Sequence, residues 1–90
     1  MTTCREARLA ELQAERKRLD ALLDDAIAQF ALVEEDMNAR MKVATHEQLQ
    51  ELMAERARIE DALGIAELVD RIDELRVCIT RLQAEAAPVT

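Results

Sequence analysis

Apolar residues recur at alternating spacings of three and four along two long segments, and this heptad pattern constrains the fold more than any other feature. The first segment contains Leu9, Leu12, Leu19, Leu23, Ala26, Phe30, Val33 and Met37. The second contains Ile65, Leu68, Ile72, Leu75, Ile79, Leu82 and Ala86. Such spacing places an apolar stripe on one side of a helix, and the stripe must be buried against another helix. The pattern therefore predicts an all-α protein.

The composition agrees with this fold class. The 90 residues include one Gly, one Pro, one Phe and neither Trp nor Tyr. Little material is left for turns, sheets or an aromatic core, and such a composition is typical of long helices. A chain of this length forms at most one small domain with a thin core, for which association is a common source of added stability. We therefore expect a homodimer or a helical partner protein.

The charge and the cysteines limit the partners and the compartment. A net charge of −7 argues against binding to nucleic acid or to anionic membranes. No apolar run approaches the roughly 18 residues of a membrane-spanning helix, and no apolar export signal follows Met1. Cys4 and Cys78 lack CxxC or metal-ligand spacing, so we expect free thiols in a reducing compartment. The predicted location is cytoplasmic.

Two capping boxes indicate where helices begin. Thr3 is followed three residues later by Glu6, and Thr45 is followed by Gln48 in the same way. In this motif the two side chains satisfy backbone N–H groups at a helix start. Pro88 is expected to stop the last helix.

These signals predict a single antiparallel helical hairpin. The two helices would be nearly equal in length, as a hairpin requires, and two hairpins could associate into a four-helix bundle. The alternative is one continuous helix in a long coiled coil. The expected segments are a helix over residues 4–41, a turn over 42–45, a helix over 46–86 and a tail over 87–90.

Opposite charges support an antiparallel register. The expected neighbours are Arg16–Arg18 with Asp70, Asp73 and Glu74, and Glu34–Asp36 with Arg56 and Arg58. Like charges in these places would favour another register. Arg16 and Arg56 occupy heptad positions that call for apolar residues, so their long stems must pass the apolar seam while their charges select the register.

The heptad frame changes at Gly64. We favour a local kink or a close helix crossing near Ile27 and Phe30, and the alternative is a second apolar side that holds a separate partner. In a third interpretation Gly64 is a C-cap and the chain has three helices. We rank that last because no N-cap residue directly follows Gly64.

Residues suited to catalysis or metal binding are sparse. His46 is the only histidine, Ser is absent, and no Gly-rich loop could hold phosphate. Cys4 and Cys78 have no neighbouring His that could act as a base. The acids between Asp20 and Asp36 fall on a helix, which lacks the turns and free carbonyls of hard-cation sites, so we expect a solvated face. We predict no enzyme activity, no cofactor, no metal and no small-molecule substrate.

The widest apolar segment is the predicted partner-binding surface, with a partner helix laid along it. Its residues are Leu19, Leu22, Ile27, Leu63, Ile65, Leu68, Val69 and Ile72. The methionines near the turn are expected in the core: Met37, Met41 and Met53. The chain is thus predicted to be a non-enzymatic protein–protein interaction module. The alternative is a self-contained homodimeric four-helix-bundle scaffold or regulator.

One stretch resembles a known family. His46-Glu47-Gln48-Leu49-Gln50, followed by Arg58-Ile59-Glu60-Asp61-Ala62-Leu63-Gly64-Ile65-Ala66, is similar to the second helix of small co-chaperones of bacterial type III secretion needle subunits. The resemblance spans about residues 46–69. It implies an acidic to neutral helical hairpin that pairs with a helical-repeat chaperone and keeps the needle subunit monomeric before export. Leu49 departs from the aromatic residue that this family prefers, and the chain continues beyond the family's usual end.

Overall fold

The computed structural model describes residues 3–86, and these residues form three helices and no strand. The all-α prediction is confirmed. The helices are α1 (Cys4–Met41), α2 (His46–Leu63) and α3 (Ile65–Ala86). The predicted tail over 87–90 lies outside the described residues.

The first helix begins and ends at the predicted residues. The Thr3 hydroxyl accepts a hydrogen bond from the Glu6 N–H at 3.0 Å, and the Thr3 N–H donates to the Glu6 carboxylate at 3.3 Å. This is a complete capping box. Thr45 and Gln48 form a second one at the start of α2, with reciprocal hydrogen bonds of 3.0 and 3.3 Å. The chain reverses direction between these two helices, so local hydrogen bonding defines the turn.

The predicted continuous helix over 46–86 is wrong, because Gly64 divides it. Gly64 adopts the left-handed conformation with φ 71°, and its N–H donates to the Asp61 carbonyl at 3.1 Å. Glycine adopts this conformation without the penalty that a Cβ brings, and it commonly ends helices for this reason. The Gly64 carbonyl in turn accepts from the Leu68 N–H at 3.0 Å, so one glycine ends α2 and caps α3. The three-helix interpretation that was ranked last is the observed one.

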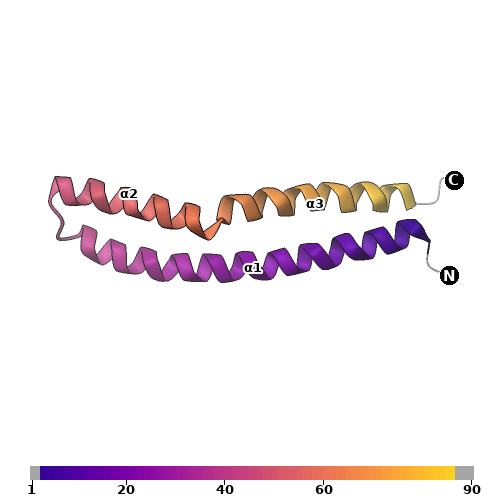
Figure 1. The fold of residues 1–90 in the computed structure, drawn as a ribbon, viewed down its shortest axis with the longest axis horizontal. Helices are drawn as coiled ribbons and strands as arrows, with labels where there is room; N and C mark the ends of the chain where they lie inside the picture. The colour runs from indigo at the N-terminus through magenta and orange to yellow at the C-terminus, as the bar shows by residue number, and fades with distance from the viewer. Residues whose placement is uncertain (1–2, 87–90) are drawn as a thin grey trace.

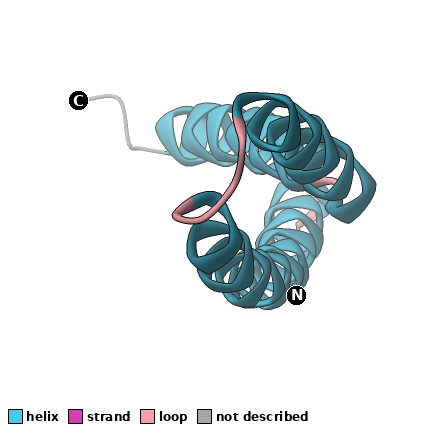
Figure 2. Cartoon of the chain, turned by 90° about the vertical axis from the view of Figure 1, so that its left-hand side faces the viewer, coloured by secondary structure: helices cyan, strands magenta, loops and turns pink. Residues whose placement is uncertain are grey.

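The helices form an elongated rod of two layers. Helix α1 runs the length of one layer, while α2 and α3 follow each other along the second layer in the opposite direction (Figure 1). The end-on view shows these two layers and no third (Figure 2). The principal extents are 66 × 21 × 17 Å.

The core lies mainly between α1 and α3. A continuous buried cluster contains Leu12, Leu19, Ile72, Leu75 and Ile79. Four partly buried residues pack against it: Leu9, Leu23, Leu68 and Leu82. These are heptad positions of both segments, so the sequence pattern selects the buried stripe of this half.

The half of the rod near the turn, where α2 packs on α1, is less well packed. Helix α1 buries Ala26, Phe30 and Met37 there, but none of the 18 residues of α2 is buried. The apolar residues of α2 that face α1 are only partly covered. Met53, which was expected in the core, is 58% exposed.

Candidate interaction surface

The eight residues predicted to bind a partner fall into three groups. Leu22, Ile27 and Val69 are exposed at 44, 50 and 40%. Leu63, Ile65 and Leu68 are partly buried, and Leu68 packs against the core cluster. Leu19 and Ile72 are both 7% exposed and belong to the core itself. Within the chain α3 covers Leu19 and α1 covers Ile72, so these two residues face the neighbouring helix and not a free surface.

The exposed residues lie on two different sides of the rod. With successive side chains about 100° apart, Ile27 is about 75° to one side of the buried stripe of α1 and Leu22 is about 65° to the other. Glu15 shares the side of Leu22 and forms an ion pair with Arg71 of α3. Val69 lies on the opposite side of α3 from Arg71, and therefore on the side of Ile27.

We call these two sides the Glu15 face and the Ile27 face. The Glu15 face is defined by Glu15, Leu22 and Arg71. The Ile27 face is defined by its exposed or partly exposed apolar residues, which are Ile27, Met53, Ile65 and Val69. When two helices pack antiparallel, residues rotated in the same sense from their buried stripes lie on the same side of the pair. Met53 of α2 is rotated in the same sense as Ile27 of α1, so it lies on this face as well.

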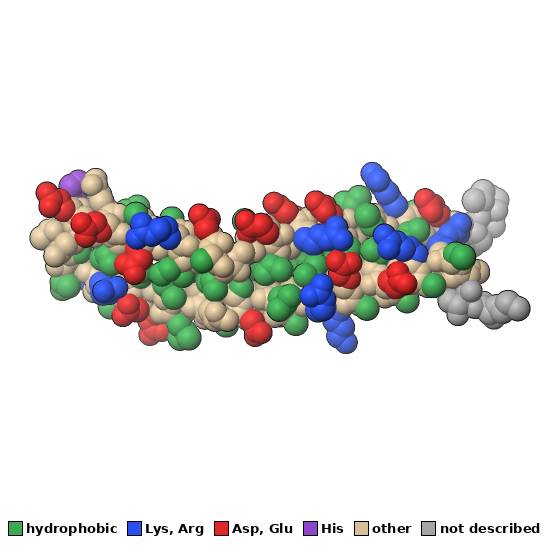
Figure 3. All heavy atoms as spheres, viewed as in Figure 1, with side chains coloured by type: hydrophobic (Ala, Val, Ile, Leu, Met, Phe, Trp, Pro, Cys, Tyr) green, Lys and Arg blue, Asp and Glu red, His purple; other side chains and the backbone are tan. Residues whose placement is uncertain are grey.

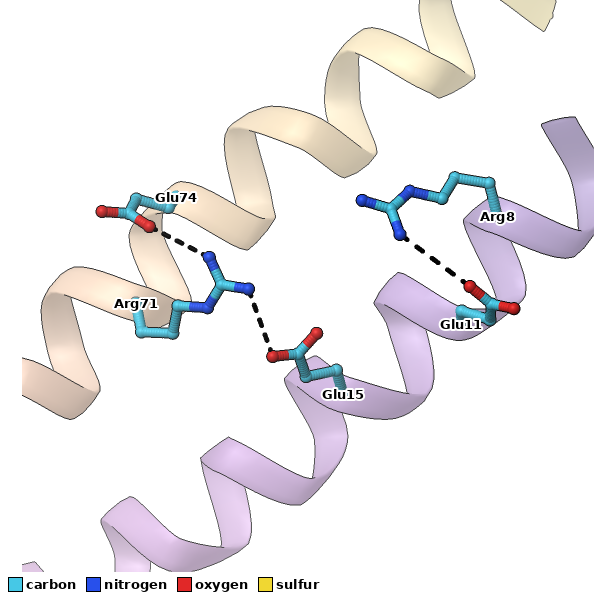
Figure 4. Close-up of polar contacts among 5 residues, drawn as sticks. All are labelled: Arg8, Glu11, Glu15, Arg71 and Glu74. Carbon is cyan, nitrogen blue, oxygen red and sulfur yellow. Dashed lines mark hydrogen bonds and ion pairs between the residues drawn. The ribbon is translucent and has the colours of Figure 1, made fainter.

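The Glu15 face carries a charged network. Arg71 donates from Nη1 to Glu74 Oε2 at 3.1 Å and from Nη2 to Glu15 Oε1 at 3.3 Å (Figure 4). The hydrogen bond with Glu74, followed by that with Glu15, raises the pKa of the Arg71 guanidinium, so its charge is retained. Arg8 and Glu11 form a further exposed pair at 3.8 Å (Figure 4). Exposed pairs contribute little stability, but they oppose covering this side with an apolar partner.

The charges predicted to face each other are partly in register. Arg56 Nη2 lies 3.1 Å from Glu34 Oε1, as expected for the half near the turn. In the other half Arg16 pairs with Asp20 of its own helix at 3.8 Å, and the pair between helices is Glu15–Arg71. The expected alignment of Arg16 with Asp70 to Glu74 is therefore not the one observed.

On the side shown in Figure 3, hydrophobic side chains lie along the middle of the line where the two layers meet, and acidic and basic side chains lie on both sides of it and, toward the termini, across it. Further exposed apolar residues lie outside the two faces: Leu32, Val43 and Val77. The heptad pattern gave no reason to select them, because they fall on the outer sides of the helices or in the turn.

The described residues offer few elements of a chemical site. Within residues 3–86 no group of three or more His, Cys, Asp or Glu side chains could hold a metal. His46 is exposed and its Nε2 lies 3.4 Å from Gln50 Nε2. Cys4 and Cys78 are exposed free thiols. None of the three described helices is long and apolar enough to cross a membrane.

Comparisons with protein-family models, with curated proteins and with solved structures found no match to this chain. The fold and surface define an all-helical rod with one acidic, ion-paired face and one face bearing exposed apolar side chains. Function is inferred from that geometry.

Proposed function

We propose that this chain is a non-enzymatic interaction module: a helical hairpin that buries its incompletely covered apolar residues against a partner helix. This proposal rests on the half of the rod in which α2 packs on α1. No side chain of α2 is buried there, although α1 buries Phe30 and Met37 in the same half. A helix added beside α1 and α2 would cover Ile27 and Met53, as neighbouring helices do in a bundle.

The finer architecture that follows is a four-helix bundle, with two helical layers contributed by the partner. The rod is only 17 Å across its shortest extent, so it has one helix–helix interface and no interior beyond it. Adding a second pair of helices turns the Ile27 face into an interior surface. This arrangement supplies the burial that a thin two-layer core lacks.

The specific form suggested by the resemblance is a co-chaperone of a type III secretion needle subunit. The support for it is the similar stretch from His46 to about Val69, which forms α2, the Gly64 cap and the start of α3. In this form the partner helices belong to a helical-repeat chaperone and the needle subunit. Mixing this chain with such a pair and measuring the mass of the complex tests the idea, and the absence of a ternary complex would reject the co-chaperone role alone.

The general module is tested by association and stability together. We expect the purified chain to associate, or to gain thermal stability as its concentration rises, and Ile27→Lys to abolish both while leaving the helical circular dichroism signal unchanged. Light scattering and melting curves over a concentration series make these measurements. A monomer that binds no hydrophobic dye, and whose midpoint depends neither on concentration nor on Ile27→Lys, would contradict the proposal.

A further inference from the structure

The chain exposes far more surface than a compact monomer of its mass. Its accessible surface is 7013 Å² at 10.2 kDa, whereas folded monomers of this mass expose about 5,300 Å². The excess of about 1,700 Å² is roughly twice the ~800 Å² that each partner contributes to a standard stable interface. The radius of gyration is 19.9 Å, against about 12 Å for a compact domain of this length. The chain therefore has enough surface for a dimer along its side.

The Ile27 face exposes more large apolar side chains than the Glu15 face, because Ile27, Met53 and Val69 are 50, 58 and 40% exposed on it. Its apolar residues include Ile27, Ile65 and Val69, which cluster near the middle of the rod around Gly64. Two ion pairs lie on this side, Glu34 with Arg56 at 3.1 Å and Arg16 with Asp20 at 3.8 Å. A paired charge carries a smaller desolvation penalty than an isolated one.

The Glu15 face opposes such docking because acids outnumber bases on it. Leu22 is its one strongly exposed leucine. Along the length of this face, at flanking helix positions, lie the carboxylates of Glu11, Glu15, Asp25, Asp36, Glu55, Glu67, Glu74 and Glu85. Two such faces brought together would place like charges opposite each other, which is destabilising.

The charge along the rod selects the relative orientation of two copies. Residues 23–64, the half near the turn, carry ten acids and four bases. Residues 3–22 with 65–86, the half near the termini, carry nine acids and eight bases. Parallel copies would place two strongly acidic halves side by side, whereas antiparallel copies place each acidic half beside a nearly neutral one.

We infer that the partner is a second copy of this chain, docked through the Ile27 face in antiparallel orientation, with a twofold axis passing near Ile27 and Ile65. This inference rests on the proposed interaction module and names its partner. The result is an antiparallel bundle with four helices in each cross-section, in which the apolar side chains at the middle of each rod meet around the axis. The Glu15 faces, with the Arg71 network, remain in solvent.

Matched lysine substitutions test the face. Val69→Lys places a charge on the Ile27 face and is expected to raise the dimer dissociation constant by about 100-fold or more, since an unpaired charge would be buried in the interface. Val77→Lys, on the outer side of α3 at 50% exposure, and Leu22→Lys, on the Glu15 face, are the controls. Each control is expected to change the constant by less than about threefold, as usual for positions outside an interface. Sedimentation equilibrium gives the constants.

A nitroxide on Cys78 tests the orientation. Cys78 is exposed and lies on the side of α3 that carries Arg71, so the label stays outside the interface, and Cys4→Ala leaves it as the one labelled thiol. Cys78 is 13 residues from Ile65, or about 20 Å along the helix, so antiparallel copies separate the two labels by about 40 Å. Parallel copies place them roughly 20–25 Å apart, the width of two helices. Pulsed electron resonance measures both ranges.

The outcomes separate this inference from the function on which it rests. A dimer weakened by Val69→Lys, with labels near 40 Å, supports both. A dimer with labels near 20–25 Å overturns the antiparallel arrangement, and a dimer weakened by Leu22→Lys instead overturns docking through the Ile27 face. Either result leaves an interaction module. A monomer that binds a hydrophobic dye through Ile27 and Val69 overturns the second copy as partner and leaves the module. A monomer whose mass, stability and dye binding change with none of these substitutions overturns both the second copy as partner and the interaction module.

Discussion

The guanidinium of Arg56 lies over the ring of Phe30, with Cζ 5.6 Å from the ring centroid. Its Nη2 donates to Glu34 at 3.1 Å, while its Nε is buried without a hydrogen-bond partner. One arginine on α2 thus contacts an aromatic ring and a carboxylate of α1. This explains how a charged residue occupies a heptad position that calls for an apolar one: its stem and guanidinium plane cover Phe30 while its terminal nitrogens reach the edge of the seam.

Replacing Arg56 with a residue of similar reach tests this relationship. We expect Arg56→Leu to be neutral or stabilising, because it removes the unpartnered Nε and keeps cover over Phe30. Arg56→Ala should cost about 1 kcal/mol through lost packing and pairing. Urea unfolding at a fixed protein concentration measures both, with exposed Arg58→Ala as control. Equal losses for Leu and Ala would show that the charge itself stabilises the chain.

The core between α1 and α3 should be the most sensitive part of the molecule. Leu75 is 1% exposed, so Leu75→Ala should reduce the free energy of unfolding by about 2–4 kcal/mol through lost burial and the cavity left behind. Val77→Ala, on the same helix and half exposed, should cost less than about 0.5 kcal/mol. Denaturant unfolding followed by circular dichroism compares the two, and Leu75→Val serves if the alanine variant does not fold. Similar losses at both positions would place the core elsewhere.

Replacing Gly64 with an L-residue should lower stability even though there is room for a Cβ, because Gly64 adopts a left-handed conformation. A Cβ at this position would meet only Glu67 Oε2 at 3.8 Å, so no clash opposes it. Gly64→Ala should nevertheless cost about 1 kcal/mol through backbone strain, whereas D-alanine introduced by chemical synthesis should be tolerated or stabilising. Thermal unfolding of the two forms makes the comparison. If both residues have the same effect, the chain does not hold a left-handed cap at Gly64.

The stability of α2 should depend more on its N-terminal capping box than on packing of its side chains. Thr45 supplies the capping hydroxyl, and no residue of α2 is buried. Thr45→Ala should therefore destabilise α2 by about 1 kcal/mol, while Thr80→Ala, on an exposed surface of α3, should have little effect. Hydrogen exchange read residue by residue is the measurement, since it reports the helices separately. A uniform change over all three helices would mean that α2 unfolds only with the whole chain.

The same exchange experiment on the unmodified chain has a further expected result. Amides in the middle of α2 should exchange faster than those around Leu75 in α3, because few buried apolar contacts hold α2 against local opening. Amides of α1 near Leu12 serve as the internal reference, as they pack against α3. Equal protection in α2 and α3 would indicate that something else covers α2 in solution, as an associated second copy would do.

Local signals in the sequence determined the helix class, the ends of α1, the start of α2 and the stripe that contains Leu12 and Leu75. They did so because capping hydrogen bonds and apolar spacing act within a few residues along the chain. The Arg56–Glu34 pair also followed from an antiparallel register. The sequence did not determine the role of Gly64, since a glycine in a helical pattern is compatible with a kink, a crossing or a cap until its φ is known.

The tertiary structure alone decided which apolar residues are left exposed. Leu19, Leu22 and Ile27 are equally apolar in sequence, yet α3 covers the first and leaves the other two on opposite faces of the rod. The division between the acidic, ion-paired Glu15 face and the apolar Ile27 face likewise arises from the rotation of each helix about its axis. That rotation is set by packing between segments far apart in the chain, for which no local pattern is sufficient.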